Sequence, residues 1–219
     1  MVAEQVRSDQ FANDLANAST PGYKPDQSIQ SSFGDVLVAN TEGGVPIGAI
    51  DEGVALSKTY TNMTPGSIQQ TGEPHDFAIE GSGFFAVQTA QGVRYTRDGQ
   101  FIASAAGALT DTAGHAVLSQ TGAPVKLAAD GSVSASSLGL FELAGAAKQG
   151  ENLYTGTAGG RASSNVRQGA LEQPTLDAAK VMVEMVGSMR NFQSGQQAIQ
   201  AIGHTLQAAS TQVGSLQGG

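Results

Sequence analysis

The stretch "FANDLANASTPGYKPDQ", residues 11–27, decides the fold because a helix-like pattern stops there and a turn begins. Residues 1 to about 19 contain no glycine or proline, and Ser8, Phe11, Leu15 and Ala18 recur at alternating steps of three and four. A type II turn favours proline at its second position and glycine at its third, as in Thr20, Pro21, Gly22 and Tyr23. The stretch predicts a helix with a thin apolar stripe that needs a partner, followed by a turn.

Two asparagines accompany this stripe. Asn13 and Asn17 are four residues apart, on one face of the predicted helix and next to Phe11 and Leu15. A short carboxamide can bond a neighbouring chain without the cost of burying a charge. We therefore expect Phe11, Asn13, Leu15 and Asn17 to form part of an assembly interface, with Asp14 facing outward.

A second helix is predicted from Leu176 onward, where a long segment lacks proline. Steps of three and four from Met182 give ten positions, of which seven are apolar and none is charged. The apolar ones are Met182, Met185, Met189, Phe192, Ile199, Leu206 and Val213. This heptad pattern predicts a coiled-coil seam, formed with the N-terminal helix or with a neighbouring chain. The alternative is an amphipathic helix packed on its own domain.

The middle of the chain, from about 53 to 165, is typical of β structure. Short apolar runs alternate with turn signals, and Asp98-Gly99 and Asp130-Gly131 suggest type I′ hairpins. The fold class predicted is α+β, with paired N- and C-terminal helices forming a coiled-coil-like domain and an irregular antiparallel β domain inserted between them. The predicted boundaries are 1–30 plus 174–219 for the helical assembly domain, 31–60 for a connecting segment and 61–173 for the β domain.

Composition excludes several classes of partner and site. The net charge of −8, with 19 acidic against 11 basic residues, argues against nucleic acid or an anionic membrane as the partner. The chain has no cysteine, hence no disulfide and no thiolate ligand. It shows neither an apolar run long enough for a membrane span nor the apolar region of a cleaved signal peptide. A position outside the cytoplasm would therefore require another export route.

Catalytic, cofactor and metal sites are not predicted. His75, His115 and His204 are far apart in sequence, without a second ligand at metal-like spacing. "GSGFFA", residues 81–86, has the glycine spacing of a dinucleotide loop but continues as a strand, whereas such a loop must open a helix. The charged group around Glu80 and Asp98 is more typical of cross-strand ion pairs than of a hydrolytic carboxylate pair.

Three blocks of sequence resemble the bacterial flagellar rod and hook proteins. The first is the 11–27 stretch, similar to the family's A-N-N-L-A-N-x-x-T-x-G-[FY]-K, with Asp14 in place of the second asparagine. The second resembles T-G-x-x-x-D-x-A-I-x-G-x-G-F-F followed by Y-T-R-x-G-x-F. The third resembles Q-G-x-L-E followed by E-M-[VI]-x-x-x-R-x-[FY], with Gln173-Pro174-Thr175 replacing the usual Ser-Asn-Val. The matching residues are Phe11, Ala12, Asn13, Leu15, Ala16, Asn17, Thr20, Gly22, Tyr23, Lys24, Thr71, Gly72, Asp76, Ala78, Ile79, Gly81, Gly83, Phe84, Phe85, Tyr95, Thr96, Arg97, Gly99, Phe101, Gln168, Gly169, Leu171, Glu172, Glu184, Met185, Val186, Arg190 and Phe192.

The resemblance implies a structural subunit of the flagellar basal-body rod, of the proximal or distal type. Its terminal helices would polymerise into the tubular drive shaft that transmits torque, and the β domain would form the outer wall. The implied partners are copies of the chain, other rod and hook proteins and the flagellar export apparatus. The implied location is the periplasmic rod, reached without a cleaved signal peptide, by a chain that lacks the family's usual residues before the first block. The alternatives are a secreted cell-wall hydrolase with a β domain and a non-flagellar surface scaffold.

Overall fold

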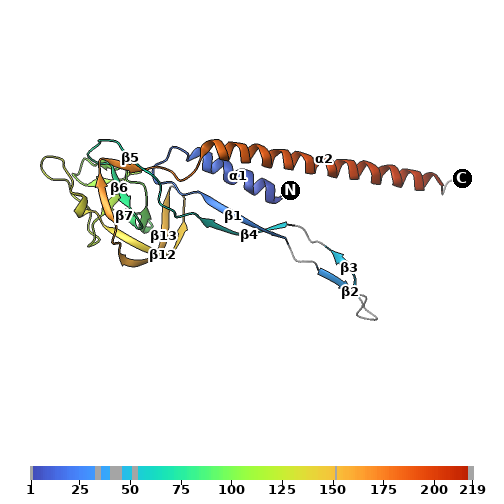
Figure 1. Ribbon diagram of the computed structural model, residues 1–219, viewed down its shortest axis with the longest axis horizontal. Coiled ribbons are helices and arrows are strands. Elements are labelled where there is room, and N and C mark those ends of the chain that lie inside the picture. Colours follow the sequence, from blue (N-terminus) through green and yellow to red (C-terminus); the bar gives the residue numbers. More distant parts are fainter. Residues whose placement is uncertain (1, 33–35, 40–45, 51–53, 151, 217–219) are drawn as a thin grey trace. The chain divides into compact units, whose positions relative to one another are not determined.

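The computed structural model describes residues 2–32, 36–39, 46–50, 54–150 and 152–216. In these ranges the α-helices are a short one near the N-terminus, α1 (Val2–Ala16), and a long one, α2 (Ala178–Leu216). The regular elements between them are β-strands, apart from one short 3-10 helix (Figure 1). Within the part that the structure describes, no helix is long and apolar enough to cross a membrane.

The chain divides into two compact units. One unit comprises residues 1–15, 28–60 and 178–219, and so contains both helices. The other comprises residues 16–27 and 61–177 and contains most of the strands. The segment 17–27, which follows α1, therefore belongs to the β unit.

A small barrel forms the centre of the β unit. Antiparallel pairing joins β7 to β8, β8 to β13, β13 to β12 and β12 back to β7, which closes a ring of four strands. Three short strands extend the sheet from β7 in the order β11, β10, β9. The bounds are β7 (Phe84–Thr89), β8 (Gly92–Thr96), β9 (Ile102–Ala103), β10 (Leu109–Thr110), β11 (Ala116–Leu118), β12 (Leu140–Lys148) and β13 (Leu153–Arg161).

Two further strand pairs bring the end of the β unit back to its beginning. β6 (Phe77–Glu80) pairs with β14 (Asn165–Gln168), and β5 (Ile68–Gln70) pairs with β15 (Ala170–Glu172). A short 3-10 helix, η1 (Ala135–Ser137), precedes β12. The remaining pairs are β1 (Asp26–Ser32) with β4 (Val54–Thr61), and β2 (Val36–Ala39) with β3 (Pro46–Ile50).

The hydrophobic core lies inside the β unit. Phe85 and Phe101 meet edge to face with ring centroids 5.3 Å apart, and Phe77 lies against Phe101 at 6.1 Å. Aliphatic residues from the surrounding strands complete the cluster, among them Ile79, Val87, Leu109, Val117, Val125 and Leu140. Several of these belong to the second resemblance block, so that block encodes core packing.

The predicted type I′ hairpins are wrong at both positions. Such a turn requires positive φ at both central residues, and Asn152 is the non-glycine residue of the described chain with positive φ. At 130–131 the glycine alone, Gly131 with φ 77°, adopts that conformation. Gly99 serves instead for close packing, because a Cβ there would lie 1.6 Å from the carbonyl oxygen of Phe77.

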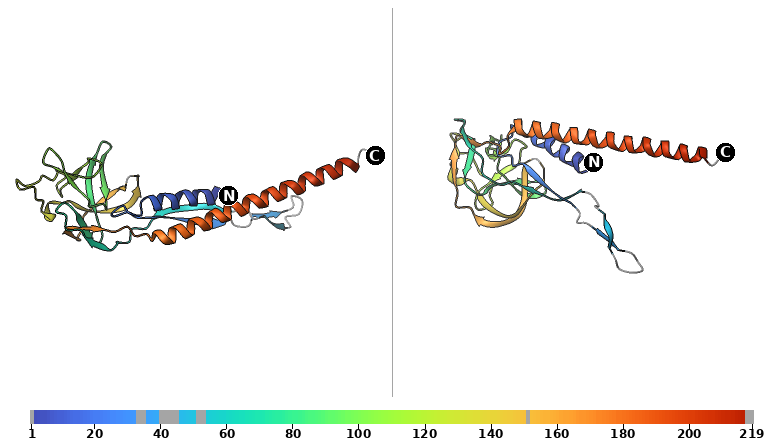
Figure 2. Two further views of the ribbon diagram at one scale, coloured as in Figure 1. Left: turned by 90° about the horizontal axis from the view of Figure 1, so that it is seen from above. Right: turned by 45° about the vertical axis from the view of Figure 1, so that its right-hand side comes forward.

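The prediction of paired terminal helices forming a coiled coil is also wrong. Figures 1 and 2 show α1 running antiparallel beside the first part of α2, which continues well past it. At 1.5 Å per residue, the 15 residues of α1 span about 22 Å and the 39 residues of α2 about 58 Å. Every described side chain of α2 from residue 196 to 209 is exposed, so α2 forms no seam with α1 there. The fold is a mainly β unit with one short and one long helix.

Candidate assembly site

The turn after α1 is tightly built. The backbone N–H of Tyr23 donates to the carbonyl oxygen of Thr20 (3.3 Å), and Gly22 between them has φ 66°. The N–H and hydroxyl of Thr20 bond the backbone and side-chain oxygens of Asn17 at 3.0 and 3.3 Å. A Cβ on Gly22 would lie 2.3 Å from the carbonyl oxygen of Arg97, so the turn requires glycine both for its backbone and for its contact.

A buried ion cluster, formed by Lys24, Arg97 and Glu172, lies directly behind this turn. The Lys24 ammonium donates to Glu172 Oε1 at 2.5 Å, and the Arg97 guanidinium donates to Glu172 Oε2 at 3.2 Å. All three side chains are at most 3% exposed. The cluster joins the segment that leaves α1, the end of β8 and the last strand before α2, so it ties together three distant parts of the chain.

Backbone groups complete the cluster. Lys24 also donates to the carbonyl oxygen of Thr64 (2.7 Å), and Arg97 to that of Gly81 (2.9 Å). The N–H of Gly66 donates to Glu172 Oε1 at 2.7 Å. Burial lowers the pKa of Lys24 from its usual range, and the hydrogen bond to Glu172 opposes that shift. A buried charge is tolerated only when it is paired and hydrogen-bonded, as here.

Hydrogen bonds with three other residues, Glu172, Lys148 and Asn152, also hold the turn. The Gly22 N–H donates to the carbonyl oxygen of Glu172 at 2.7 Å. Lys148 donates to the carbonyl oxygen of Lys24 at 2.9 Å, with its ammonium 4.0 Å from the centroid of the Tyr23 ring. The Asn152 amide donates to the carbonyl oxygen of Pro21 at 3.0 Å. Residues 20–24 are therefore an integral part of the β unit and fix where the chain leaves it toward the helices.

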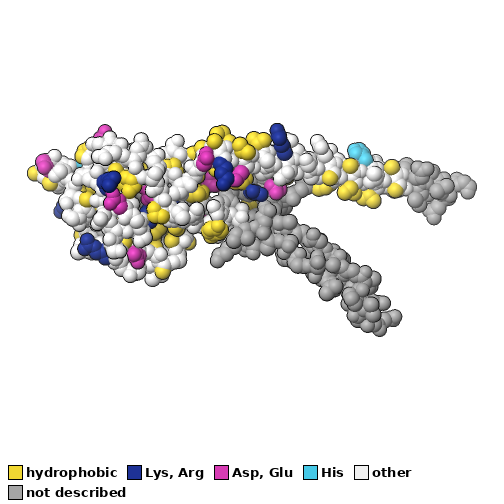
Figure 3. Space-filling model, in the orientation of Figure 1, with side chains coloured by type: hydrophobic (Ala, Val, Ile, Leu, Met, Phe, Trp, Pro, Cys, Tyr) yellow, Lys and Arg dark blue, Asp and Glu magenta, His cyan; other side chains and the backbone are white. Residues whose placement is uncertain are grey.

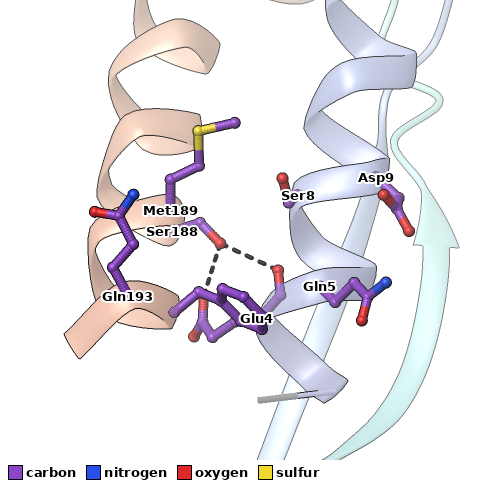
Figure 4. Close-up of a pocket in the computed structure, with 8 residues that line it drawn as sticks. Glu4, Gln5, Ser8, Asp9, Ser188, Met189 and Gln193 are labelled. Carbon is purple, nitrogen blue, oxygen red and sulfur yellow. Dashed lines mark hydrogen bonds between the residues drawn. The ribbon is translucent and has the colours of Figure 1, made fainter. Parts of the chain in front are cut away.

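The two helices meet within their own unit at a groove that contains a polar contact (Figure 4). Ser188 of α2 is buried, and its hydroxyl lies 2.8 Å from Glu4 Oε2 and 3.2 Å from the Glu4 carbonyl oxygen, to which it donates. Beside this contact is a cavity of about 280 Å³, lined by Glu4, Gln5, Ser8, Asp9, Ser188, Met189, Phe192 and Gln193. The contact is short and polar, unlike a coiled-coil seam.

The residues predicted on the first helix fall into different environments. Phe11 is buried, with the Arg7 guanidinium 5.4 Å from its ring centroid, and Leu15 is half-buried. Asn13 is exposed. Asn17 lies beyond the last residue of α1 and its side chain caps the turn, because the helix ends before it. Asp14, expected to face outward, is instead 5% exposed.

The residues predicted on the second helix are mostly accessible. Met182, Met189, Ile199 and Leu206 are exposed, while Met185 and Phe192 are half-buried. Val213 belongs to α2, but its side chain lies outside the residues whose burial is described. Three exposed apolar residues stand outside the predicted heptad, namely Val183, Val186 and Ile202.

The exposed apolar side chains of α2 form two groups on different sides of the helix. We call Met182, Val183, Val186 and Met189 the proximal patch, and Ile199, Ile202 and Leu206 the distal patch. At about 100° per residue, the centres of the two patches lie roughly opposite each other. Figure 3 shows hydrophobic atoms on the upper side of the first part of α2 and on the lower side of its later part. The drift of a straight helix, about 20° per heptad, gives only about 45° over the 16 residues between the patch centres. The larger separation arises because Val183, Val186 and Ile202 lie outside the predicted heptad positions.

The carboxylates considered for hydrolysis have other contacts. Glu80 forms an ion pair with Arg167, with 2.6 Å between their charged atoms. Asp98 accepts from the Gln100 N–H at 2.9 Å and lines a cavity of about 250 Å³ with Asp111 and His115. Burial raises the pKa of Asp98 to about 6, and the charge of Asp111 adds to this shift. In the described ranges no group of three or more histidine, cysteine or acidic side chains could hold a metal ion.

Pattern reasoning on the sequence missed the ion cluster, since Lys24 and Glu172 are 148 residues apart. A signal was nevertheless present. Each of the three resemblance blocks contributes one charged residue to the cluster, namely Lys24, Arg97 and Glu172. The blocks therefore pointed to these residues, although not to their contact with one another.

Two family models match the chain. The model for the flagellar hook protein FlgE/F/G D1 domain matches residues 78–139, which include Arg97. The model for the C-terminal region of the flagellar basal body rod FlgEFG proteins matches residues 167–212, which include Glu172 and most of α2.

Similar proteins match over nearly the whole chain. The flagellar basal-body rod protein FlgF of Caulobacter vibrioides is 32% identical over 85% of this chain and 83% of its own length. The flagellar hook-basal body complex protein FlhO of Bacillus subtilis is 26% identical over 99% of this chain and 96% of its own length. FlgG from Bacillus subtilis, another basal-body rod protein, is 28% identical over 93% and 92%. The chain belongs to the family of flagellar basal-body rod proteins.

Proposed function

We propose that this chain, a structural subunit of the flagellar basal-body rod, polymerises through its terminal helices into the tubular drive shaft that transmits torque. The observation that carries this proposal is the long helix α2, whose exposed apolar side chains include Ile199 and Leu206 at 57% and 66% exposure. Apolar side chains gathered on a helix and left in water mark an interaction surface. The sequence predicts an assembly domain of residues 1–30 plus 174–219. We propose that the helices α1 and α2 form the assembly surface within it.

The ion cluster supports the proposal because it joins the segment after α1 to the strand before α2. Both are held by the same buried carboxylate of Glu172, within the β unit. We assign the β unit to the outer part of the shaft.

We also propose a location and a set of partners for the chain. The chain is a component of the flagellar basal body, and we propose its periplasmic rod as the location. The proposed partners are further copies of the chain, other rod and hook proteins and the flagellar export apparatus, with export that needs no cleaved signal peptide. We propose no enzymatic activity.

Polymerisation of the purified chain tests the proposal. Ile199→Asp together with Leu206→Asp should abolish sedimenting polymers, because two charges would have to be buried at each contact. The matched control is Val93→Asp with Ile102→Asp, which alters two exposed apolar residues of the β unit. Normal polymerisation of the α2 variant would contradict the assigned surface.

The location has its own test. Hook–basal bodies purified from the source bacterium should contain the chain in the rod segment. A deletion strain should lack motility, and the wild-type gene, but not the α2 variant, should restore it. Motile cells with intact basal bodies in the absence of the chain would contradict the proposed function.

A further inference from the structure

We propose that ordered water is bound inside the β unit, beside the ion cluster, where it bonds the hydroxyl of Tyr154 and the Nε–H of Arg97. Both groups are buried, and neither has a hydrogen-bond partner among the described residues. The same holds for two oxygens nearby, Asn152 Oδ1 and Thr175 Oγ1. This inference goes beyond the proposed function, because it concerns how the interior of the β unit is completed and does not depend on assembly.

The unpartnered atoms of Tyr154 and Arg97 are shielded from bulk solvent. Tyr154 is 0% exposed and Arg97 is 3% exposed. A buried donor or acceptor without a partner destabilises the folded state, because the group has given up its bonds to water. Nearly all such groups in folded proteins therefore bond either protein or a buried water molecule. Where the protein supplies no partner, a bound water is the ordinary solution.

Tyr154 and Arg97 lie close together on paired strands. Tyr154 of β13 is paired with Tyr95 of β8, two residues before Arg97. The ring of Phe84 contacts both side chains, since its centroid lies 5.3 Å from that of Tyr154 and 5.1 Å from Arg97 Cζ. Burial raises the pKa of Tyr154 well above its usual range, and charges of the ion cluster also act on it. The hydroxyl therefore keeps its proton and lies near the cluster.

Asn152 and Thr175 bring their unpartnered oxygens to the turn at residues 20–24. Asn152 Nδ2 donates to the carbonyl oxygen of Pro21 at 3.0 Å. Because that oxygen can only accept, this bond fixes which end of the amide faces the turn and leaves Oδ1 as the unpartnered end. The backbone N–H of Thr175 donates to the carbonyl oxygen of Tyr23 at 3.3 Å, while its hydroxyl is unpartnered. Unbonded polar atoms therefore border the turn that the ion cluster supports.

The mixture of donors and acceptors identifies water as the ligand. The Nε–H of Arg97 only donates, Asn152 Oδ1 only accepts, and the hydroxyls of Tyr154 and Thr175 do both. An anion could bond the donors alone, and a metal cation could bond the acceptors alone. Water both donates and accepts, and a buried water typically makes about three hydrogen bonds.

Tyr154→Phe tests the contact, because it removes the hydroxyl and keeps the ring. If the hydroxyl bonds water, its loss removes a hydrogen bond and should raise the equilibrium constant for unfolding about fivefold. The matched control is Tyr95→Phe, the half-buried partner of Tyr154 on β8, which should change the constant by less than about twofold. A hydroxyl without any partner would give the opposite sign, since its removal relieves an unsatisfied group. An unchanged or smaller constant in Tyr154→Phe would therefore overturn the proposal.

Crystal structures of the full chain and of Tyr154→Phe, grown in sodium bromide, identify the ligand itself. Water should lie about 3 Å from Tyr154 Oη and from Arg97 Nε in the wild type. The water at Tyr154 should be absent from the variant. An anomalous bromide peak at Arg97 would overturn the proposal in favour of an anion site. Side chains that bond protein groups instead, with no water between them, would overturn it as well.

Discussion

Glu172 is the residue on which the junction depends, because it is the carboxylate that neutralises both Lys24 and Arg97. Glu172→Gln keeps the size of the side chain and removes the charge, which leaves two buried cations without a counterion. Breaking a buried pair in this way costs about 3–5 kcal/mol of unfolding free energy. Urea unfolding followed by circular dichroism measures the loss.

The control for Glu172→Gln is Glu80→Gln, which removes the carboxylate of a more exposed pair with Arg167. The expected loss there is about 0–1 kcal/mol, because exposed pairs contribute little. Equal losses in the two variants would show that burial of the ion cluster is unimportant for stability.

Asp98 should make stability depend on pH. Its pKa in the folded protein is about 6 against a usual value of 3.8, so the folded state holds the proton more tightly than the unfolded state. The protonated carboxyl of Asp98 therefore makes its full contribution to the free energy of unfolding below about pH 4. This contribution is lost as the pH rises toward 6 and above. Asp98→Asn, which keeps the acceptor for the Gln100 N–H, should therefore be about 1–3 kcal/mol more stable than wild type at pH 7.5 and equal to it at pH 3.5.

Unfolding midpoints of wild type and Asp98→Asn, measured between pH 3.5 and 7.5, show whether the difference in stability grows with pH as expected. Asp130→Asn is the matched control, because the pKa of Asp130 is lowered by hydrogen bonds from Ser132 and the opposite trend applies. A parallel pH dependence in wild type and Asp98→Asn would exclude Asp98 as the cause.

At the scale of the helix, α2 should gain order on assembly. Its side chains from residue 196 to 209 are exposed, and helices derive most of their stability from packing. We expect the helical circular dichroism signal per residue to rise when monomers polymerise. The Ile199→Asp, Leu206→Asp variant should show no rise under the same conditions. An identical helical signal in monomer and polymer would contradict this expectation.

The same elements show how far the sequence predicts the structure. The absence of proline after Leu176 and the spacing of apolar residues predict a long helix, and α2 extends from Ala178 to Leu216. Heptad counting misjudged the faces of that helix, because the exposed side chains of Val183, Val186 and Ile202 lie outside the counted positions. The predicted coiled coil is wrong, because α1 and α2 meet through the polar contact of Ser188 with Glu4 and the side chains of α2 from residue 196 to 209 are exposed.

Contacts between distant residues set the limit of prediction. Local periodicity reports which residues share a face, but not which residues 148 positions apart meet, as Lys24 and Glu172 do. Asp14 shows the same limit, because its charge suggested exposure and the tertiary structure buries it. The resemblance blocks identified the residues of the ion cluster without revealing that they touch.

For the whole molecule, the ion cluster determines how mechanical load crosses the chain. Lys24 follows the end of α1 by eight residues, and Glu172 precedes the start of α2 by six. Tension applied between the two helices therefore passes from one to the other through the Lys24–Glu172 pair and the hydrogen bond from Gly22 to Glu172. The barrel lies outside the direct path between Lys24 and Glu172, although Lys148 and Asn152 donate to the carbonyl oxygens of Lys24 and Pro21 and so share part of the load.

Pulling on single molecules by their two ends would measure this load path. The wild-type chain should resist until the pair breaks and only then release the length of the barrel, whereas Glu172→Gln should release it at a lower force. Equal rupture forces would mean that the strands carry the load. In a shaft subunit built in this way, tension between the helices passes mainly through the carboxylate of Glu172 and not through the strands of the barrel.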